Sequence, residues 1–324
     1  MWPRAVARRC DMTPRTLVVA FLALNGAWAQ AQTTAPAAAP VSPLTVCVSE
    51  DNAPYSFMRK GQVGGFDVAL AGAVARELGR ELRLVPFEPE VEKESMLTHE
   101  VNALLSAGLC ELASGFPLLK SDLGAPTRAR FKTADHPGAA RKRDRPFVEL
   151  GTLIHSQPYQ GTALVVVQRS GLPPVQDLGG LKGRKIAAVA GTLEGTLIAM
   201  HGGGALRDSM VTMGQRDDLW AAMKDGRIDA MLLPTAAVDA QRQRGAGAAA
   251  ADIQLGKPRP LGINLGFVAL APQAGLIAVV DRVIARSLAS GELQRWASEA
   301  GLSFVPATAP AVASTLDLAT LLAD

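Results

Sequence analysis

The sequence predicts an α/β protein of two lobes, each a mostly parallel sheet flanked by helices, with hinge crossovers between them. Three observations support this fold class. Strand and helix patterns alternate from Leu44 to Phe116, which is typical of a parallel sheet. A second alternating unit begins near Gly179. Between the two units, the apolar strand Thr162–Val167 can carry the chain from one lobe to the other.

The first 31 residues have the pattern of an export signal. Four arginines precede an apolar run at Leu17–Leu24, and Ala27-Trp28-Ala29 is a small-x-small cleavage site. The apolar run is too short to span a bilayer. Residues 32–43 are rich in Ala, Thr and Pro, as expected of a flexible lead-in. We therefore expect a periplasmic protein that is secreted with a cleaved signal and has no stable membrane insertion.

The first lobe is expected to contain residues 44–160 and 268–306. Its opening strand, Leu44–Ser49, runs into an acidic and aromatic loop, and a helix then begins at Phe66-Asp67. We expect Phe66 to act as a hydrophobic staple and Asp67 as the N-cap of this helix. The other elements expected in this lobe are strands at 82–87 and 110–116 and helices at 91–105, 274–288 and 292–300.

The second lobe is expected to contain residues 161–267, and residues 307–324 are expected to form a C-terminal tail. A strand at 185–189 leads into a helix after Gly191-Thr192, and a helix at 217–224 precedes a strand at 228–233. The return crossing to the first lobe is expected at Ile263–Leu270.

Composition excludes several function classes. The chain has 33 Lys and Arg against 30 Asp and Glu, and loss of the signal arginines brings the mature protein close to neutral. This balance gives no reason to expect a nucleic-acid partner. The four histidines are scattered without metal-ligand spacing, and no nucleophile-elbow or phosphate-loop motif is present. We expect no enzymatic activity, no metal and no other cofactor, with a small carbon–oxygen lyase as the enzymatic alternative.

Seven short motifs stand in the order found in one known family. The chain resembles the bacterial periplasmic solute-binding proteins of family 3, which have the type II periplasmic binding protein fold. That resemblance implies two lobes that close on a small-molecule ligand by a hinge motion, and it implies a monomer. The motifs are Gly64-Gly65-Phe66-Asp67, Ser106–Gly115, Ser156-Gln157-Pro158-Tyr159, Asp177–Gly183, Gly191-Thr192, Asp225–Ala230 and Leu265-Gly266-Phe267.

The resemblance also indicates a disulfide. Cys10 leaves with the signal, so Cys47 and Cys110 remain in an oxidising compartment. In family 3 the strands that hold these two positions are neighbours, which favours a Cys47–Cys110 bond. Two buried free thiols are the alternative, because neighbouring strands still need suitable Cβ geometry.

The ligand site is expected in the cleft between the lobes. One wall should be the loop after the first strand, although Tyr55 could equally cover the edge of the core. The other wall should include the helix start at Gly191-Thr192, whose amides can hold an anion, unless this is an ordinary helix cap. The predicted ligand-binding residues are Asp51, Asn52, Tyr55, Ser114, Gly115, Tyr159, Gly191, Thr192 and Thr235.

Two features of amino-acid binders in this family are missing. Their Thr-x-x-Arg step after the third strand grips the ligand carboxylate, but Gly115–Asp122 contains no Arg. Pro234 stands where those proteins carry an Asp for the ligand ammonium. We therefore expect a small polar or anionic ligand other than a standard amino acid, captured for an ABC-type permease.

A long basic insertion at 118–150 suggests a lid or a docking surface for an acidic partner, with a solvated loop as the alternative. A narrower similarity involves Cys47, Gly108–Glu111 and Gly115-Phe116-Pro117. These residues are similar to binding-protein-like partners of periplasmic quinoprotein alcohol dehydrogenases. An accessory role for such a dehydrogenase is therefore the alternative to transport.

Overall fold

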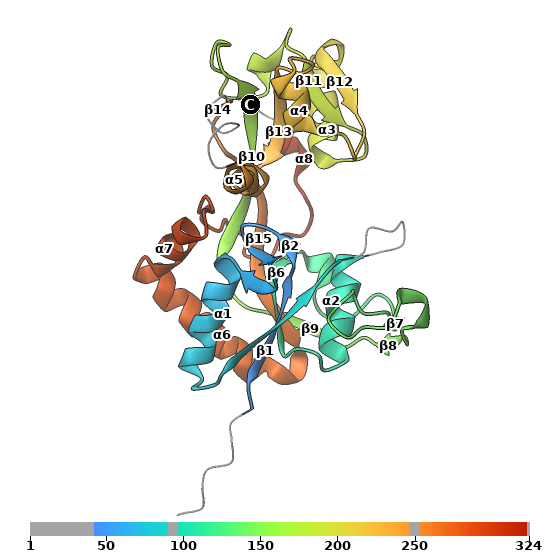
Figure 1. Ribbon diagram of the computed structural model, residues 1–324, viewed down its shortest axis with the longest axis vertical. Helices are drawn as coiled ribbons and strands as arrows, with labels where there is room; N and C mark the ends of the chain where they lie inside the picture. Colours follow the sequence, from blue (N-terminus) through green and yellow to red (C-terminus); the bar gives the residue numbers. More distant parts are fainter. Residues whose placement is uncertain (1–41, 90–95, 246–252, 323–324) are drawn as a thin grey trace, which may run out of the picture. The chain divides into compact units, whose positions relative to one another are not determined.

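The computed structural model describes residues 42–89, 96–245 and 253–322 (Figure 1). The predicted export signal, nearly all of the lead-in and the first part of the helix expected at 91–105 lie outside the described residues. The remaining elements form two groups, a first lobe built around β1 and a second lobe built around β11 (Figure 1).

One continuous sheet of ten strands runs through both lobes, in the order β12-β11-β13-β10-β15-β6-β1-β5, with β14 beside β10 and β9 beside β15. The three strands at each end of this order are parallel, and β10 and β15 are antiparallel to each other and to their neighbours. Its strands are β1 (Leu44–Ser49), β5 (Leu82–Phe87), β6 (Leu112–Pro117), β9 (Leu153–His155), β10 (Gln160–Arg169), β11 (Ile186–Val189), β12 (Met210–Met213), β13 (Ala230–Pro234), β14 (Ile253–Leu255) and β15 (Arg259–Leu270).

Helices flank the sheet in both lobes (Figure 1). The first lobe has α1 (Phe66–Glu77), α2 (Leu97–Ser106), α6 (Ala274–Ala289) and α7 (Glu292–Glu299), and the second has α3 (Leu193–Met200), α4 (Leu219–Lys224), α5 (Thr235–Arg244) and α8 (Leu318–Leu322). Six single turns of 3-10 helix lie at Lys120–Asp122, Lys142–Asp144, Gly179–Leu181, His201–Gly203, Arg207–Ser209 and Ala271–Gln273. The predicted fold class, with mostly parallel sheets between helices, is confirmed.

Two small sheets were not predicted. The acidic and aromatic segment after β1, which was expected to be a loop, is a three-stranded sheet. Its strands are too short to give a strand pattern in the sequence. The basic insertion contains a second, two-stranded sheet that contacts α2. These strands are β2 (Asp51–Asn52), β3 (Ser56–Arg59), β4 (Gln62–Gly64), β7 (Arg130–Phe131) and β8 (Val148–Glu149).

The start of α1 corrects one expectation. Asp67 is not the N-cap, because the helix begins at Phe66 and Gly65 occupies the cap position with φ +121°. A Cβ at Gly65 would lie 2.4 Å from the carbonyl oxygen of Tyr55, so only glycine fits there. The first helical amides are satisfied by the preceding loop instead, from Phe66 to the Pro54 carbonyl and from Asp67 to the Tyr55 carbonyl.

Asp67 is free to turn inward, and it forms a buried hydrogen-bond network with Tyr159. The Tyr159 hydroxyl donates to Asp67 Oδ1 at 2.9 Å and accepts from the Gly115 amide at 2.8 Å. Both side chains are almost fully buried. Phe66 and Phe267 pack against the Tyr159 ring. Because Tyr159 directly precedes β10, this network holds the start of the crossing strand to α1 and β6.

Burial raises the pKa of the Asp67 carboxyl to about 7, although the hydrogen bond from the Tyr159 hydroxyl acts in the opposite direction. Burial also raises the pKa of Tyr159 well above its usual value, and the Asp67 carboxylate adds to this effect. Folding therefore favours the neutral, protonated form of both side chains.

The C-terminal segment runs between the lobes alongside the two crossing strands. The buried Asn264 side chain of β15 exchanges hydrogen bonds with the Thr308 backbone, donating at 2.8 Å and accepting at 2.9 Å. Further along, the Ala313 amide donates to the Leu118 carbonyl at 2.9 Å. Leu321 of α8 then packs into the apolar core of the second lobe. Residues 307–322 are thus held at successive points from the first lobe to the second.

The basic insertion is an ordered part of the first lobe. Arg145 is buried, and its guanidinium donates to the Thr133 carbonyl at 2.8 Å and to Asp135 at 3.0 Å. Lys132 donates to two backbone carbonyls of the same insertion. These cations stabilise the insertion itself, while its role as a lid or docking surface stays a prediction.

The predicted disulfide is present. Cys47 of β1 and Cys110, two residues before β6, are bonded with their Cα atoms 5.6 Å apart. The bond lies within an apolar cluster that includes Phe87, Leu104 and Val268. It closes a loop with a sequence separation of 63 residues, which in the chain-entropy model stabilises the fold by about 4 kcal/mol.

We expect the Cys47→Ala/Cys110→Ala double variant to lose about 2–5 kcal/mol of unfolding free energy in urea titrations. Alanine suits both sites because they are apolar and buried. Reductant should destabilise the wild-type protein by a similar amount and leave the double variant unchanged. Equal stability of oxidised and reduced wild type would contradict a structural role for the bond.

The Asp67 carboxyl should make stability depend on pH. Its pKa is higher in the folded protein than in the unfolded chain, so folding takes up a proton between about pH 4 and pH 7. The free energy of unfolding should therefore fall as pH rises through this range, by up to about 4 kcal/mol. The Asp67→Asn variant should lack this component, and the exposed Asp225→Asn should retain it. An unchanged pH slope in Asp67→Asn would rule the assignment out.

Candidate functional site

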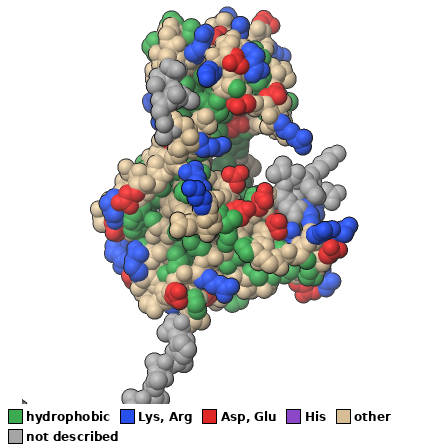
Figure 2. Space-filling view, viewed as in Figure 1, with side chains coloured by type: hydrophobic (Ala, Val, Ile, Leu, Met, Phe, Trp, Pro, Cys, Tyr) green, Lys and Arg blue, Asp and Glu red, His purple; other side chains and the backbone are tan. Residues whose placement is uncertain are grey.

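A cavity of about 770 Å³ lies where the loop after β1, the crossing strands and the start of α5 come together. Its volume is within the range of small-molecule sites in proteins. Its walls carry charged groups of both signs, and Figure 2 shows acidic and basic side chains close together on this face of the molecule. The charged and polar lining residues are Glu50, Asp51, Asn52, Tyr55, Arg59, Thr162, Thr235 and Arg244.

The first wall comes from the small sheet β2-β3-β4. Asp51 and Asn52 of β2 are exposed toward the cavity, and Tyr55 lines it with only 6% of its surface exposed. Burial and the neighbouring Asp67 raise the pKa of Tyr55 well above its usual value, while Gln160 opposes the shift. The Tyr55 side chain is therefore held in its neutral form.

The second wall is the N-terminus of α5. This helix follows β13 with no intervening loop, so Pro234, Thr235, Ala236 and Ala237 all line the cavity. The first amides of a helix lack intrahelical acceptors and carry partial positive charge. This end of α5 therefore favours a negatively charged group.

Two arginines supply full positive charges. Arg59 of β3 lies over the Phe57 ring, with Cζ 4.6 Å from the ring centroid, and Arg244 ends α5. Sequence analysis missed both residues. The Phe57-x-Arg59 alternation along a strand was a usable signal, because it places both side chains on one face. No such signal existed for Arg244, since α5 was itself not predicted.

Two acidic residues, Glu50 and Asp51, also line the cavity. Partial burial raises the pKa of Glu50, and the nearby carboxylates of Glu88, Asp135 and Asp51 add to the effect. The lining thus combines carboxylates that accept hydrogen bonds, from Glu50 and Asp51, with donors from the two arginines and the first amides of α5.

Four of the nine predicted ligand-binding residues line the cavity, namely Asp51, Asn52, Tyr55 and Thr235. Gly115 adjoins it, because a Cβ there would lie 3.8 Å from Asn52 Nδ2 and 3.0 Å from Asp67 Oδ2. Ser114 precedes it in β6 and is buried. Tyr159 lies below, in the network with Asp67.

Gly191 and Thr192 are not among the residues that line this cavity. The Thr192 hydroxyl accepts a hydrogen bond from the Gly195 amide at 3.1 Å and so caps α3 in the second lobe. The ordinary helix-cap interpretation of this motif therefore describes its geometry.

Over residues 42–89, 96–245 and 253–322, no three His, Cys, Asp or Glu side chains are grouped to hold a metal ion. Within the same ranges, the structure contains no helix with the length and apolar character needed to cross a membrane.

Comparison with known protein families identifies one that matches part of the chain. Residues 44–108 match the family of bacterial extracellular solute-binding proteins, family 3. No curated protein matches the chain.

Solved structures resemble the chain over most of its length. The second substrate-binding domain of a putative amino acid ABC transporter from Streptococcus pneumoniae has 15% identity and a TM-score of 0.57, over 80% of this chain and 100% of that one. Substrate-binding domain 2 of Lactococcus lactis GlnP, in an open conformation, has 17% identity and a TM-score of 0.56, over 79% and 94%. The unliganded L-cystine solute receptor of Neisseria gonorrhoeae has 18% identity and a TM-score of 0.54, over 80% and 92%.

The residues matched by the family include β1, the small sheet β2-β3-β4, α1, β5 and α2, which together form the part of the first lobe that carries Asp51, Asn52, Tyr55 and Arg59. At these identities the likeness to solved structures concerns the fold. Residues 44–108 therefore resemble solute-binding proteins of family 3, and the described part of the chain has the fold of the substrate-binding domains and the solute receptor named above.

Proposed function

We propose that this protein captures a small anionic and polar solute in the cavity of about 770 Å³ and delivers it to an ABC-type permease in the periplasm. One observation carries the proposal: two arginines and a helix N-terminus face the same space as a hydroxyl, an amide and carboxylates. Such a set can hold one small molecule by several directed hydrogen bonds and leave no charge of the ligand without a partner.

α5, Arg59 and Arg244 would bind an anionic part of the ligand. Amides at the start of a helix and guanidinium groups both donate to carboxylate or phosphate oxygens. Thr235 is well placed to add its hydroxyl, since it is the first residue of α5 and lines the cavity. The anion-binding element of the second lobe is thus α5 in this proposal, and α3 with its Thr192 cap has no part in it.

The wall formed by the β2-β3-β4 sheet would bind the remaining polar groups of the ligand. Asp51 accepts hydrogen bonds, and Asn52 and Tyr55 can both donate and accept them. The residues that line the cavity after β6 are Pro117 and Leu119, which are apolar, and Pro234 stands at the start of α5. The Arg and the Asp that hold the carboxylate and ammonium of an amino acid in family 3 are therefore replaced at these positions by apolar residues. In this proposal the ligand is a small organic acid whose hydroxyl groups donate to the carboxylates of this wall, in place of the ammonium of a standard amino acid.

Delivery to a permease is argued from the family and the crossing strands. Solute-binding proteins of this fold close on a ligand by rotation about segments that cross between lobes. Here β10 and β15 are paired to each other at the cavity, where Thr162, Ile263 and Leu265 line its floor. A ligand that touches both α5 and the β2-β3-β4 sheet would favour the closed state through these contacts.

The proposal is tested first by ligand identification. Native mass spectrometry of protein purified from periplasm should show a bound species of small mass that is lost on mild denaturation. A thermal-shift screen of organic acids, sugar acids and phosphate esters should return a ligand whose saturating concentration raises the unfolding temperature. No bound species and no hit, together with recovery of a quinoprotein dehydrogenase on pull-down, would favour the accessory-protein alternative.

For the ligand so identified, we expect Arg244→Ala and Arg59→Ala each to weaken binding by about tenfold or more, because each removes a charged hydrogen-bond donor. Isothermal titration calorimetry would measure the loss. Arg242→Ala is the matched control, since Arg242 lies on the same helix and pairs with Asp239 instead. Equal affinities in all three variants would place the ligand elsewhere and overturn the proposed site.

A further inference from the structure

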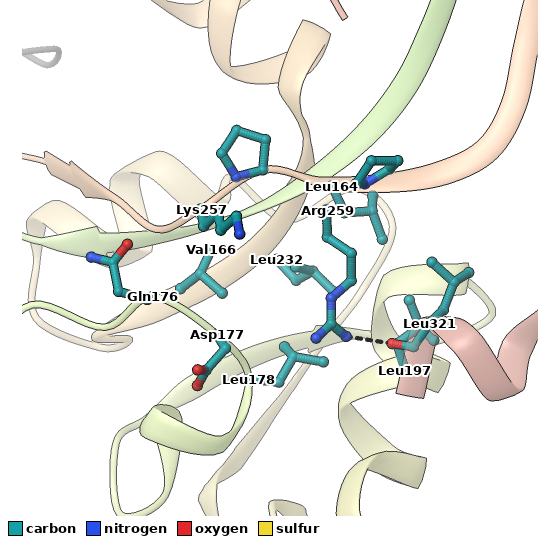
Figure 3. Close-up of a pocket in the computed structure, with 12 residues that line it drawn as sticks. Leu164, Val166, Gln176, Asp177, Leu178, Leu197, Leu232, Lys257, Arg259 and Leu321 are labelled. Atoms are coloured by element: carbon teal, nitrogen blue, oxygen red, sulfur yellow. Dashed lines mark hydrogen bonds between the residues drawn. The ribbon is translucent and has the colours of Figure 1, made fainter. Parts of the chain in front are cut away.

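A second cavity, of about 390 Å³, lies within the second lobe (Figure 3). It shares no lining residue with the cavity of the proposed solute site. Its walls come from β10, β13, α3, the segment before β15 and the C-terminal helix α8.

The floor of this second cavity is apolar. Leu164 and Val166 of β10, Leu197 of α3 and Leu232 of β13 line it, and none of them is more than 6% exposed. Side chains that are this deeply buried usually pack against one another without leaving space. Space left beside apolar atoms is unfavourable, because those atoms lose dispersion contacts. An apolar group in the cavity would restore the contacts.

The rim of the cavity is predominantly cationic. Lys257 and Arg259 lie on it, and among the described residues that line the cavity Asp177 carries a carboxylate, which accepts a hydrogen bond from the Gly180 amide at 3.1 Å. Figure 3 shows Arg259 extending over the leucine side chains with its guanidinium toward α8. One guanidinium nitrogen donates to the Leu321 carbonyl at 2.5 Å. This hydrogen bond fixes the guanidinium beside α8, among the leucines that line the cavity (Figure 3).

We propose that this cavity binds a small amphiphilic anion, a carboxylate with an unbranched aliphatic or aryl body. The apolar body would pack on Leu164, Val166, Leu197 and Leu232, and the carboxylate would lie at Lys257 and Arg259. This combination of an apolar body in a buried space and a charge at a cationic rim is how pockets of this size select a ligand. The site is separate from solute capture and does not depend on it.

The test uses octanoate as the probe and 1-octanol as its neutral counterpart, on the full-length mature protein. Methyl NMR spectra should show octanoate shifting leucine and valine signals of the second lobe, with Leu197 and Leu232 assigned by Leu→Ile substitution. Octanoate should bind about tenfold more tightly than 1-octanol, because only octanoate pairs with the rim cations.

The variant Lys257→Glu should weaken octanoate binding by about tenfold and leave 1-octanol binding unchanged. Lys224→Glu is the matched control, since Lys224 is an exposed lysine of the same lobe outside the cavity. A second variant, Leu178→Phe, fills the space from Leu178 at its wall and should abolish binding of both probes while the protein stays folded.

The proposal is overturned if octanoate shifts only signals of the first lobe or none at all. It is also overturned if Lys257→Glu and Lys224→Glu bind octanoate equally well. Failure in either form leaves the solute site untouched, because the Arg59 and Arg244 variants probe a different cavity.

Discussion

The hydrogen bond from Tyr159 to Asp67 fixes the point at which the chain leaves the first lobe. Tyr159 is the last residue before the crossing strand β10, and its hydroxyl joins α1 to the Gly115 amide of β6. The aromatic contacts of its ring with Phe66 and Phe267 exclude water from this bond. Everything that the second lobe presents to the cavity depends on where β10 starts, and so on this buried pair.

The same pair explains why Asp67 does not cap α1 as predicted. Gly65 takes the cap position, which releases the Asp67 side chain from capping and turns it toward Tyr159. The helix then receives its first acceptors from the Pro54 and Tyr55 carbonyls. The loop that carries Asp51, Asn52 and Tyr55 is thus tied by its backbone to the helix below it. Rigid support of this kind keeps binding groups in place before a ligand arrives.

Much of the fold could be predicted from residue patterns, because strands such as Leu44–Ser49 and Thr162–Val167 are apolar runs and the helices at 274–288 and 292–300 have clear periodicity. α5 could not, since Thr235–Arg244 is polar, has few apolar positions and directly follows a strand without a turn signal. Its omission hid the second wall of the cavity apart from Thr235, and it hid Arg244. Gly191-Thr192 was predicted as the anion-binding helix start instead. The sequence of a glycine before a helix does not show whether the first amides of that helix face a cleft.

The prediction for the cavity was better on the first lobe than on the second. Asp51, Asn52 and Tyr55 follow a strong strand, and residues at the carboxyl end of a strand in a parallel sheet lie at one edge. Tyr159 was expected there because a tyrosine at a crossover suits a cleft, yet its hydroxyl had a buried partner in Asp67 that spacing along the chain did not reveal.

The C-terminal segment places the two ends of the described chain on different lobes. Residue 42 precedes β1 in the first lobe, while α8 ends at Leu322 against the core of the second. Fluorophores attached at these two positions would therefore stand on different lobes without any insertion into the fold. Energy transfer between them would report the distance between the two lobes.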